Sequence, residues 1–139
     1  MFTLHPQLEK DCFAIGQFEL CRLLLMNDRN YPWFILVPQR ESISEVYQLT
    51  VADQLLLCRE SNSLSEILAR HFAADKMNVA ALGNVVPQLH IHHIVRYRHD
   101  PAWPAPVWGK SPAVPYTDTE LQQLLSNLVP VLGEHLHVA

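Results

Sequence analysis

The chain has 139 residues, of which 49% are hydrophobic and 17% charged, so it is long enough to bury a core and too apolar to be intrinsically disordered. Its formal net charge of −4 disfavours a nucleic-acid-binding surface, which needs a basic face, but permits a small anionic ligand. No apolar stretch approaches the roughly 20 residues of a membrane span, and no signal peptide is recognisable. We therefore expect one cytoplasmic domain over residues 1–139, with neither a membrane nor a nucleic acid as partner.

The three cysteines fit a reducing compartment. Cys12, Cys21 and Cys58 are an odd number and stand at no metal-like spacing, which disfavours a disulfide framework. We expect them to be free, buried thiols.

The first third of the chain predicts strands. Residues 11–26 contain two apolar runs divided by Gly16-Gln17, a pattern typical of a β-hairpin. Residues 27–32 are rich in turn-forming residues and are expected to form a loop. The aromatic and β-branched run 33–37 ends at Pro38, and its continuous apolarity predicts a strand that is covered on both faces.

The middle of the chain predicts the main helix, over residues 50–72. Thr50 and Asp53 form an acceptable N-terminal cap, and leucines recur at helical spacing. The polar stretch 60–63 weakens the apolar stripe and leaves a kink open as an alternative.

Two more strands are expected after this helix. Residues 76–82 form a candidate strand, Gly83-Asn84 a turn, and residues 85–97 a long strand. Arg96 and Arg98 would share one face near the end of the long strand. Either could attract an anionic ligand, although an exposed strand end is the favoured interpretation.

A proline-rich segment and a second helix complete the chain. Residues 100–115 hold five of the ten prolines, so they predict an ordered loop and not a helix or a central strand. Its two tryptophans, Trp103 and Trp108, could stack on a nucleobase, meet a second polypeptide or cap the core, and a structural or interface role is favoured. Thr117 opens a capping box for a C-terminal helix that Pro130 should bend or end. The order of elements predicts an α+β fold around an antiparallel sheet, with one main helix and a C-terminal helix.

Three histidines lie within four residues near the predicted long strand. Because alternate side chains of a strand share a face, Gln88, His90 and His92 are expected to point one way and His93 the other. The face that carries Gln88, His90 and His92 is therefore polar in mid-strand, which calls for an explanation.

Three explanations compete. The histidines could simply be exposed to solvent. They could bind zinc, although a third ligand would have to come from His99 or from a distant carboxylate. The third explanation is nucleophilic catalysis, because a neutral imidazole attacks phosphorus well and leaves well.

The stretch from Asn78 to His92 resembles the signature of the histidine triad (HIT) family. In that family an asparagine and a glycine-led turn precede a strand that reads His-apolar-His-apolar-His, and here Gly83-Asn84 precedes Gln88-Leu-His90-Ile-His92. The resemblance covers roughly residues 24–98. It implies a HIT-like fold, no required cofactor or metal, and a homodimer with a shared sheet.

The resemblance also implies roles for residues of the motif. His90 would be the nucleophile that forms a nucleotidyl-histidine intermediate, and His92 would hydrogen-bond the α-phosphate. Asn78 would lie near the phosphate or the ribose, Asn27 near the ribose and base, and Asn84 would be a further substrate-binding candidate in the turn. The substrate would be a nucleoside phosphoramidate, a nucleoside phosphate ester or a dinucleoside polyphosphate.

Two residues depart from the family pattern. Gln88 replaces the first histidine and cannot take up a proton at neutral pH, and Val85 stands where many members carry a hydroxyl residue. These departures leave a second hypothesis open, a nucleotide-binding protein with little or no turnover. We predict that Gln88→His keeps or raises activity, because it restores the residue that the family carries there.

Overall fold

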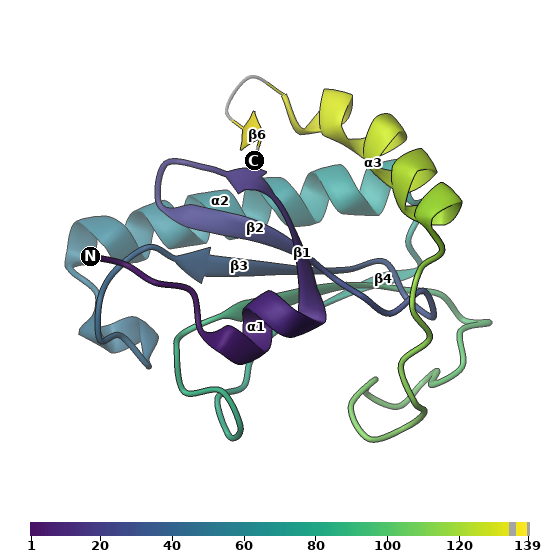
Figure 1. The fold of residues 1–139 in the computed structure, drawn as a ribbon, viewed down its shortest axis with the longest axis horizontal. Helices are drawn as coiled ribbons and strands as arrows, with labels where there is room; N and C mark the ends of the chain where they lie inside the picture. The colour runs from purple at the N-terminus through teal and green to yellow at the C-terminus, as the bar shows by residue number, and fades with distance from the viewer. Residues whose placement is uncertain (134–135, 139) are drawn as a thin grey trace.

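The computed structural model describes residues 1–133 and 136–138, and within them the strands form one six-stranded antiparallel sheet in the order β4-β5-β3-β2-β1-β6 (Figure 1). This confirms the predicted α+β class with an antiparallel sheet. The strands are β1 (Cys12–Gln17), β2 (Cys21–Met26), β3 (Trp33–Pro38), β4 (Lys76–Ala81), β5 (Ile91–Arg96) and β6 (His137–Val138). The helices are α1 (Pro6–Asp11), the short 3-10 helix η1 (Val46–Gln48), α2 (Val51–His71) and α3 (Asp118–Leu132).

The sheet has two covered faces with different coverings. One face packs against α2 and α3, which contribute leucines such as Leu64 and Leu128 to the larger apolar core. The other face is covered by the N-terminal segment, α1 and the proline-rich loop, through residues such as Leu8, Ala102 and Val107. Figure 1 shows α2 running behind the sheet and α1 lying in front of it. Both faces of β3 are therefore buried, as its unbroken apolar run predicts.

The β1–β2 hairpin exists, but its predicted turn at Gly16-Gln17 is wrong. Both residues belong to β1 and pair with Leu23 and Arg22, and the chain turns at residues 18–20. The glycine serves a close approach of backbone instead, because a side chain at position 16 would collide with the carbonyl of His137 in β6.

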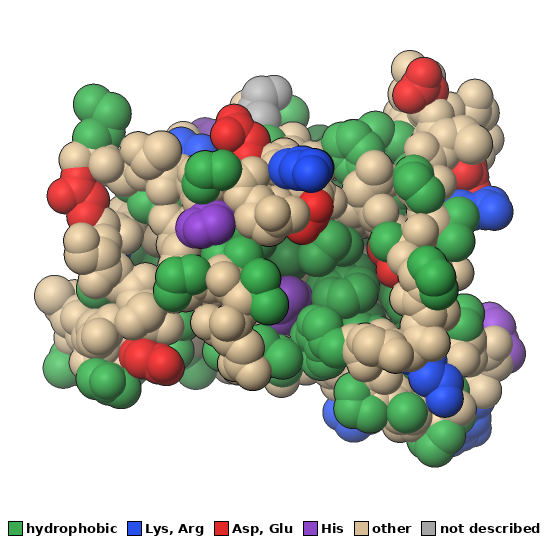
Figure 2. Space-filling view, turned by 60° about the horizontal axis from the view of Figure 1, so that its bottom comes forward, with side chains coloured by type: hydrophobic (Ala, Val, Ile, Leu, Met, Phe, Trp, Pro, Cys, Tyr) green, Lys and Arg blue, Asp and Glu red, His purple; other side chains and the backbone are tan. Residues whose placement is uncertain are grey.

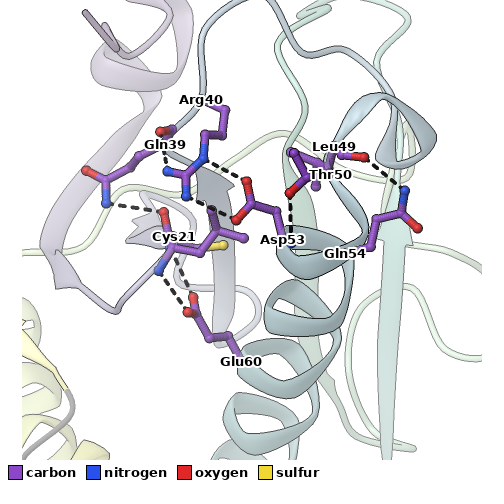
Figure 3. Close-up of polar contacts among 9 residues, drawn as sticks. Cys21, Gln39, Arg40, Leu49, Thr50, Asp53, Gln54 and Glu60 are labelled. Atoms are coloured by element: carbon purple, nitrogen blue, oxygen red, sulfur yellow. Dashed lines mark hydrogen bonds and ion pairs between the residues drawn. The ribbon is translucent and has the colours of Figure 1, made fainter.

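Helix α2 runs without interruption through its polar middle, because its inward-facing polar side chains have partners. The carboxylate of Glu60 is buried and accepts hydrogen bonds from the backbone amides of Leu20 and Cys21 at 2.9 and 3.0 Å, which fixes the β1–β2 turn (Figure 3). The predicted cap is confirmed, with the Asp53 amide donating to Thr50 Oγ1 at 3.1 Å.

The long strand predicted over residues 85–97 is partly wrong, because β5 begins only at Ile91. Pro87 has no amide hydrogen to give to a ladder, and the Leu89 amide donates to the carbonyl of Ile43 instead of to a neighbouring strand. Residues 85–90 are consequently an irregular connection that leads directly into the histidines. The preceding strand, predicted over residues 76–82, is confirmed as β4.

The proline-rich segment is a loop without helix or strand, as predicted, and side chains fasten both of its ends. The Asp100 carboxylate accepts the amides of residues 102 and 103, while Asp28 and Asn27 accept those of residues 114 and 116. The predicted capping box of α3 is confirmed at Thr117. Pro130 does not end this helix, which continues to Leu132; the proline lies in the last turn, and only two helical residues follow it.

The cysteines are free, but not all of them are buried. Cys21 is buried and Cys12 is partly buried, whereas Cys58 is exposed on α2, which corrects the expectation of three buried thiols. Burial and the charge of Asp11 raise the pKa of Cys12 to about 12, so this thiol stays protonated at neutral pH. Among the described residues, no helix is both long and apolar enough to cross a membrane.

Candidate active site

His90 and His92 lie together on the face of the sheet opposite α2. Their ring centroids are 4.9 Å apart, and both side chains are largely buried. Figure 2 looks onto this side of the molecule, where the surface is hollowed and a histidine lies among hydrophobic side chains. The sequence prediction that these two histidines share a face is confirmed, although His90 stands one residue before β5.

One hydrogen bond fixes the proton on the His90 ring. Its Nδ1 lies 2.7 Å from the backbone carbonyl oxygen of Gln88. A carbonyl can only accept, so Nδ1 carries the hydrogen and donates it. In the neutral ring Nε2 then holds the free lone pair, which is the form that a nucleophile needs.

The His92 ring is held in the opposite tautomer. The indole Nε1–H of Trp33 donates to His92 Nδ1 at 2.9 Å, so the hydrogen of the neutral ring lies on Nε2. Burial, and secondarily the positive charges that His90 and His93 would carry, lower the pKa of His92 to about 3. His92 is therefore neutral at pH 7 and presents a hydrogen-bond donor next to the lone pair of His90.

His93 faces α2, as the strand alternation predicts. Its Nδ1 donates to the carbonyl of Ile91 at 3.0 Å, and its Nε2 accepts from the hydroxyl of Ser61 at 2.7 Å. The side chain is fully buried, and burial lowers its pKa to about 4. Both ring nitrogens are thus satisfied by the protein, and His93 belongs to the core and not to the candidate site.

Gln88 lies before the strand, and its side chain holds the N-terminal segment. Its Oε1 accepts from the amide of His5 and its Nε2 donates to the carbonyl of Thr3, both at 2.9 Å. The side chain therefore bridges two backbone groups of one extended segment. Only the backbone carbonyl of Gln88 hydrogen-bonds His90, a role that the sequence did not reveal.

The HIT domain family model matches residues 7–99, about two thirds of the chain. The chain belongs to the histidine triad family. Members of this family are generally nucleotide hydrolases and transferases, and the fold of this protein is of that type.

Three solved structures of histidine triad proteins are similar to this one over nearly the whole chain. The protein from Marinobacter aquaeolei VT8 is 52% identical, with a TM-score of 0.94 and coverage of 97% of this chain and 98% of that one. The protein from Sinorhizobium meliloti 1021 is 45% identical (TM-score 0.91, coverage 94% and 96%), and that from Bradyrhizobium japonicum is 40% identical (TM-score 0.93, coverage 95% and 98%). No protein of curated function matches the chain in sequence.

The three asparagines predicted from the triad signature lie in different surroundings. Asn78 is opposite Ile94 in the β4–β5 ladder, and its Oδ1 accepts from Arg96 at 2.7 Å. Asn27 Oδ1 accepts a hydrogen bond from the amide of Tyr116, at the end of the proline-rich loop. Asn84 is exposed in a bend. Within the described residues, none of the three hydrogen-bonds His90 or His92, so their contact with a substrate stays a prediction.

The two arginines at the end of β5 differ. Arg98 is exposed, as favoured, but the same expectation is wrong for Arg96, which is 1% exposed. The guanidinium of Arg96 makes two hydrogen bonds to the Asp100 carboxylate, and others to Asn78 and to the carbonyl of Ala105. Its charge is thereby neutralised in the interior, and it ties the proline-rich loop to the sheet.

Trp33 and Trp108 complete the surroundings of His92; the sequence offered Trp108 as a residue that could stack on a base but did not indicate Trp33. Trp108 packs edge-on against His92, with ring centroids 5.0 Å apart, and against Trp33 at 5.7 Å. Trp103 instead lies over the guanidinium of Arg96 at 5.6 Å. The favoured structural role of the loop tryptophans is confirmed for these contacts, while stacking of Trp108 on a base stays a prediction.

The zinc hypothesis lacks a third ligand in the part of the chain that the structure describes. No cluster of three or more histidine, cysteine or acidic side chains suited to a metal ion is found there. His99, the nearest candidate in sequence, is exposed and stacks on Tyr97 at 5.1 Å.

Proposed function

We propose that this histidine triad protein is a nucleotide hydrolase or nucleotidyl transferase in which His90 is the nucleophile. The observation that carries the proposal is the pair of opposite tautomers, with a free lone pair on His90 Nε2 and a hydrogen on His92 Nε2. Attack on phosphorus needs a lone pair, and the charge that develops on the phosphoryl oxygens needs a nearby donor.

The reaction would proceed in two displacements. In the first, the lone pair of His90 Nε2 forms a bond to the α-phosphorus, the bond from phosphorus to the leaving group breaks, and the leaving group departs with the electron pair and takes a proton from solvent. In the second, water attacks the same phosphorus, the N–P bond breaks, and its electron pair returns to Nε2 while the proton of the water passes to solvent. An alcohol in place of water gives transfer instead of hydrolysis.

Two neighbouring groups support this route. His92 Nε2–H would donate to a non-bridging phosphoryl oxygen, and the carbonyl of Gln88 would stabilise the positive charge that His90 acquires on phosphorylation. No side-chain cation is required at this point. Arg96, the buried cation nearest in sequence, is already committed to Asp100.

The hollow beside the histidines suits a nucleoside. Figure 2 shows hydrophobic side chains around it, and the partly buried ring of Trp108 packs against His92. Partly buried aromatic and aliphatic side chains of this kind bind the flat face of a base, while polar groups fix the phosphate. We therefore propose a nucleoside phosphoramidate, a nucleoside phosphate ester or a dinucleoside polyphosphate as substrate class.

A nucleotide-binding protein with little turnover is the second candidate. It is favoured by Gln88, whose side chain is occupied by the N-terminal segment, and by Val85, which is 87% exposed and offers no hydroxyl. Neither residue can move a proton for His90.

One experiment separates the two candidates. Purified protein is mixed with a labelled adenosine phosphoramidate and, separately, with diadenosine tetraphosphate, and AMP release is followed for the wild type, His90→Ala and His99→Ala. His99 is an exposed histidine nearby, so His99→Ala controls for loss of an imidazole. An enzyme loses turnover only in His90→Ala. Tight binding of AMP without turnover in any of the three would establish the binding protein.

We also propose a homodimer that joins two sheets through β4. This strand is an open edge of the sheet, and Val79 on it is 49% exposed. An exposed edge strand of apolar side chains readily pairs with another copy. Sedimentation should report a dimer for the wild type and a monomer for Val79→Lys, because a lysine on the edge opposes pairing. A monomeric wild type would contradict the proposal.

A cytoplasmic location is proposed on the cysteines. Cys12, Cys21 and Cys58 are all free, which fits a compartment that keeps thiols reduced. Fractionation of cells that express the protein should place it with cytoplasmic enzymes, and recovery from an oxidising compartment would contradict this.

A further inference from the structure

Trp33 makes the one hydrogen bond that the His92 ring has within residues 1–133 and 136–138. Trp33 lies on β3, directly opposite Ile94, and His92 lies opposite Ile35, so the two side chains are diagonal neighbours on the same face of the sheet. A long aromatic side chain reaches across this diagonal, and the indole Nε1 meets His92 Nδ1 at 2.9 Å.

This contact allows a single arrangement of hydrogens. An indole N–H is only a donor, and a neutral imidazole has one donor and one acceptor nitrogen. His92 Nδ1 must therefore accept, and the hydrogen must lie on Nε2. Both partners are buried, so a ring with its hydrogen on Nδ1 would leave two donors facing each other without water to separate them.

Neighbouring rings keep the contact in place. Trp108 packs edge-on against both Trp33 and His92, at interplanar angles of 89° and 78°. Tyr31 also packs edge-on against Trp33, with ring centroids 6.3 Å apart. The His92 ring is thus prevented from flipping, which would exchange its two nitrogens.

We propose that Trp33 is a positioning residue for the reaction, which holds His92 in the Nε2–H tautomer so that it always presents a donor beside His90. The inference rests on the proposed function for its catalytic consequence, but the tautomer itself is a property of the free protein. Trp33 hydrogen-bonds His92 and, within the described residues, makes no hydrogen bond to His90. It acts through His92, much as the carbonyl of Gln88 acts through His90.

The test is the variant Trp33→Phe, which keeps an aromatic ring and removes the N–H. The protonated and unprotonated nitrogens of each histidine are distinguished by ¹⁵N NMR of the imidazoles at pH 7. In the wild type we expect hydrogen on Nε2 of His92 and on Nδ1 of His90. In Trp33→Phe, His92 should lose its single tautomer while His90 keeps Nδ1–H.

Trp108→Phe is the matched control, because Trp108 packs on the same ring without a hydrogen bond to it in the described structure. It should leave the His92 tautomer unchanged. A His92 that stays wholly Nε2–H in Trp33→Phe would overturn the proposal. If that variant does not fold, the wild type decides alone, because hydrogen on His92 Nδ1 would also overturn it.

Kinetics then test the consequence. Complete loss of an oxyanion donor costs about 10²- to 10³-fold in kcat. A shifted tautomer removes the donor only part of the time, so kcat should fall in proportion to the fraction of His92 that NMR shows without hydrogen on Nε2, about twofold for an even mixture, with KM within about threefold. An unchanged kcat with a changed tautomer would overturn the positioning role. If the wild type has no turnover, the proposed function fails, whereas the NMR result still decides what Trp33 does to His92.

Discussion

His92 and His93 are adjacent in sequence, are both buried, and are both neutral at pH 7, yet they lie on opposite faces of the sheet in different kinds of surroundings. On the α2 face, Ser61 and the carbonyl of Ile91 satisfy both nitrogens of His93. On the other face, Trp33 satisfies only one nitrogen of His92, and no partner is found for the second within the described residues. Burial alone therefore does not separate a core histidine from a candidate site histidine; the number of ring nitrogens that the protein satisfies does.

The largest effect should come from removing the ring of His92. His92→Ala deletes a donor to the phosphoryl oxygens and should lower kcat by about 10²- to 10³-fold. Steady-state kinetics with the better of the two adenosine substrates measure this. His99→Ala, which removes an exposed imidazole, should keep wild-type kcat. An equal loss of kcat in both variants would contradict a specific role of His92.

Both buried histidines should make the fold sensitive to acid, and His93 can be tested separately from the candidate site. The pKa of His93 is about 4 in the folded protein and near 6.5 when unfolded, so the unfolded chain binds more protons between these values. The free energy of unfolding should therefore fall by on the order of 3 kcal/mol through His93 as the pH drops from 7 to 4, in addition to a parallel contribution from His92.

Urea titrations at several pH values measure this dependence. His93→Gln cannot titrate, so its free energy of unfolding should change less steeply over the same range, even if the variant is less stable at pH 7. Identical slopes for the variant and the wild type would mean that His93 is not protected from protons in the fold.

A smaller effect on stability is expected from removing the Ser61 hydroxyl, which hydrogen-bonds His93. Ser61→Ala leaves the buried Nε2 of His93 without a donor, which costs about 1–3 kcal/mol, partly offset by the better helix propensity of alanine. Ser63→Ala, an exposed change on the same helix, should be neutral or slightly stabilising. Equal stability of the two variants would show that the Ser61 contact contributes nothing.

The smallest effect concerns Gln88, where the structure changes the expectation drawn from the triad pattern. The amide of Gln88 presents a donor and an acceptor side by side to one extended segment, and an imidazole cannot do so because its nitrogens point in diverging directions. Gln88→His should therefore loosen the segment around Thr3 and His5, cost about 1 kcal/mol and lower turnover a few-fold. Higher activity than the wild type would instead support the original view of Gln88 as a deficit.

Local patterns predicted most of the fold, because they depend on neighbours in sequence. The cap at Thr50, the capping box at Thr117 and the buried run of β3 are each written in a few consecutive residues. The start of β5 was mispredicted because apolar residues continue across Pro87, and the missing amide hydrogen decided against strand pairing there.

The candidate site was predictable only in part, for a different reason. His90 and His92 follow from alternation along one strand, but Trp33 reaches His92 only because β3 and β5 are neighbours in the sheet, which no local pattern states. The burial of Arg96 likewise depends on the return of Asp100 four residues later to form an ion pair inside the fold. Which residues distant in sequence meet is decided by the order of strands in the sheet. The family resemblance predicted the chemistry of His90 and His92 but not these partners.

The fastening of the proline-rich loop has a consequence for hydrogen exchange. Side chains of Asp100, Asp28 and Asn27 accept four backbone amides from a segment that has neither helix nor strand, those of Ala102, Trp103, Val114 and Tyr116. These amides should exchange with deuterium as slowly as amides of the sheet, while their unbonded neighbours exchange quickly. The proline-rich loop, which contains Trp108, would thus detach from the sheet only in the larger fluctuations of the molecule. A ligand would then have to reach the histidines while this loop stays in place.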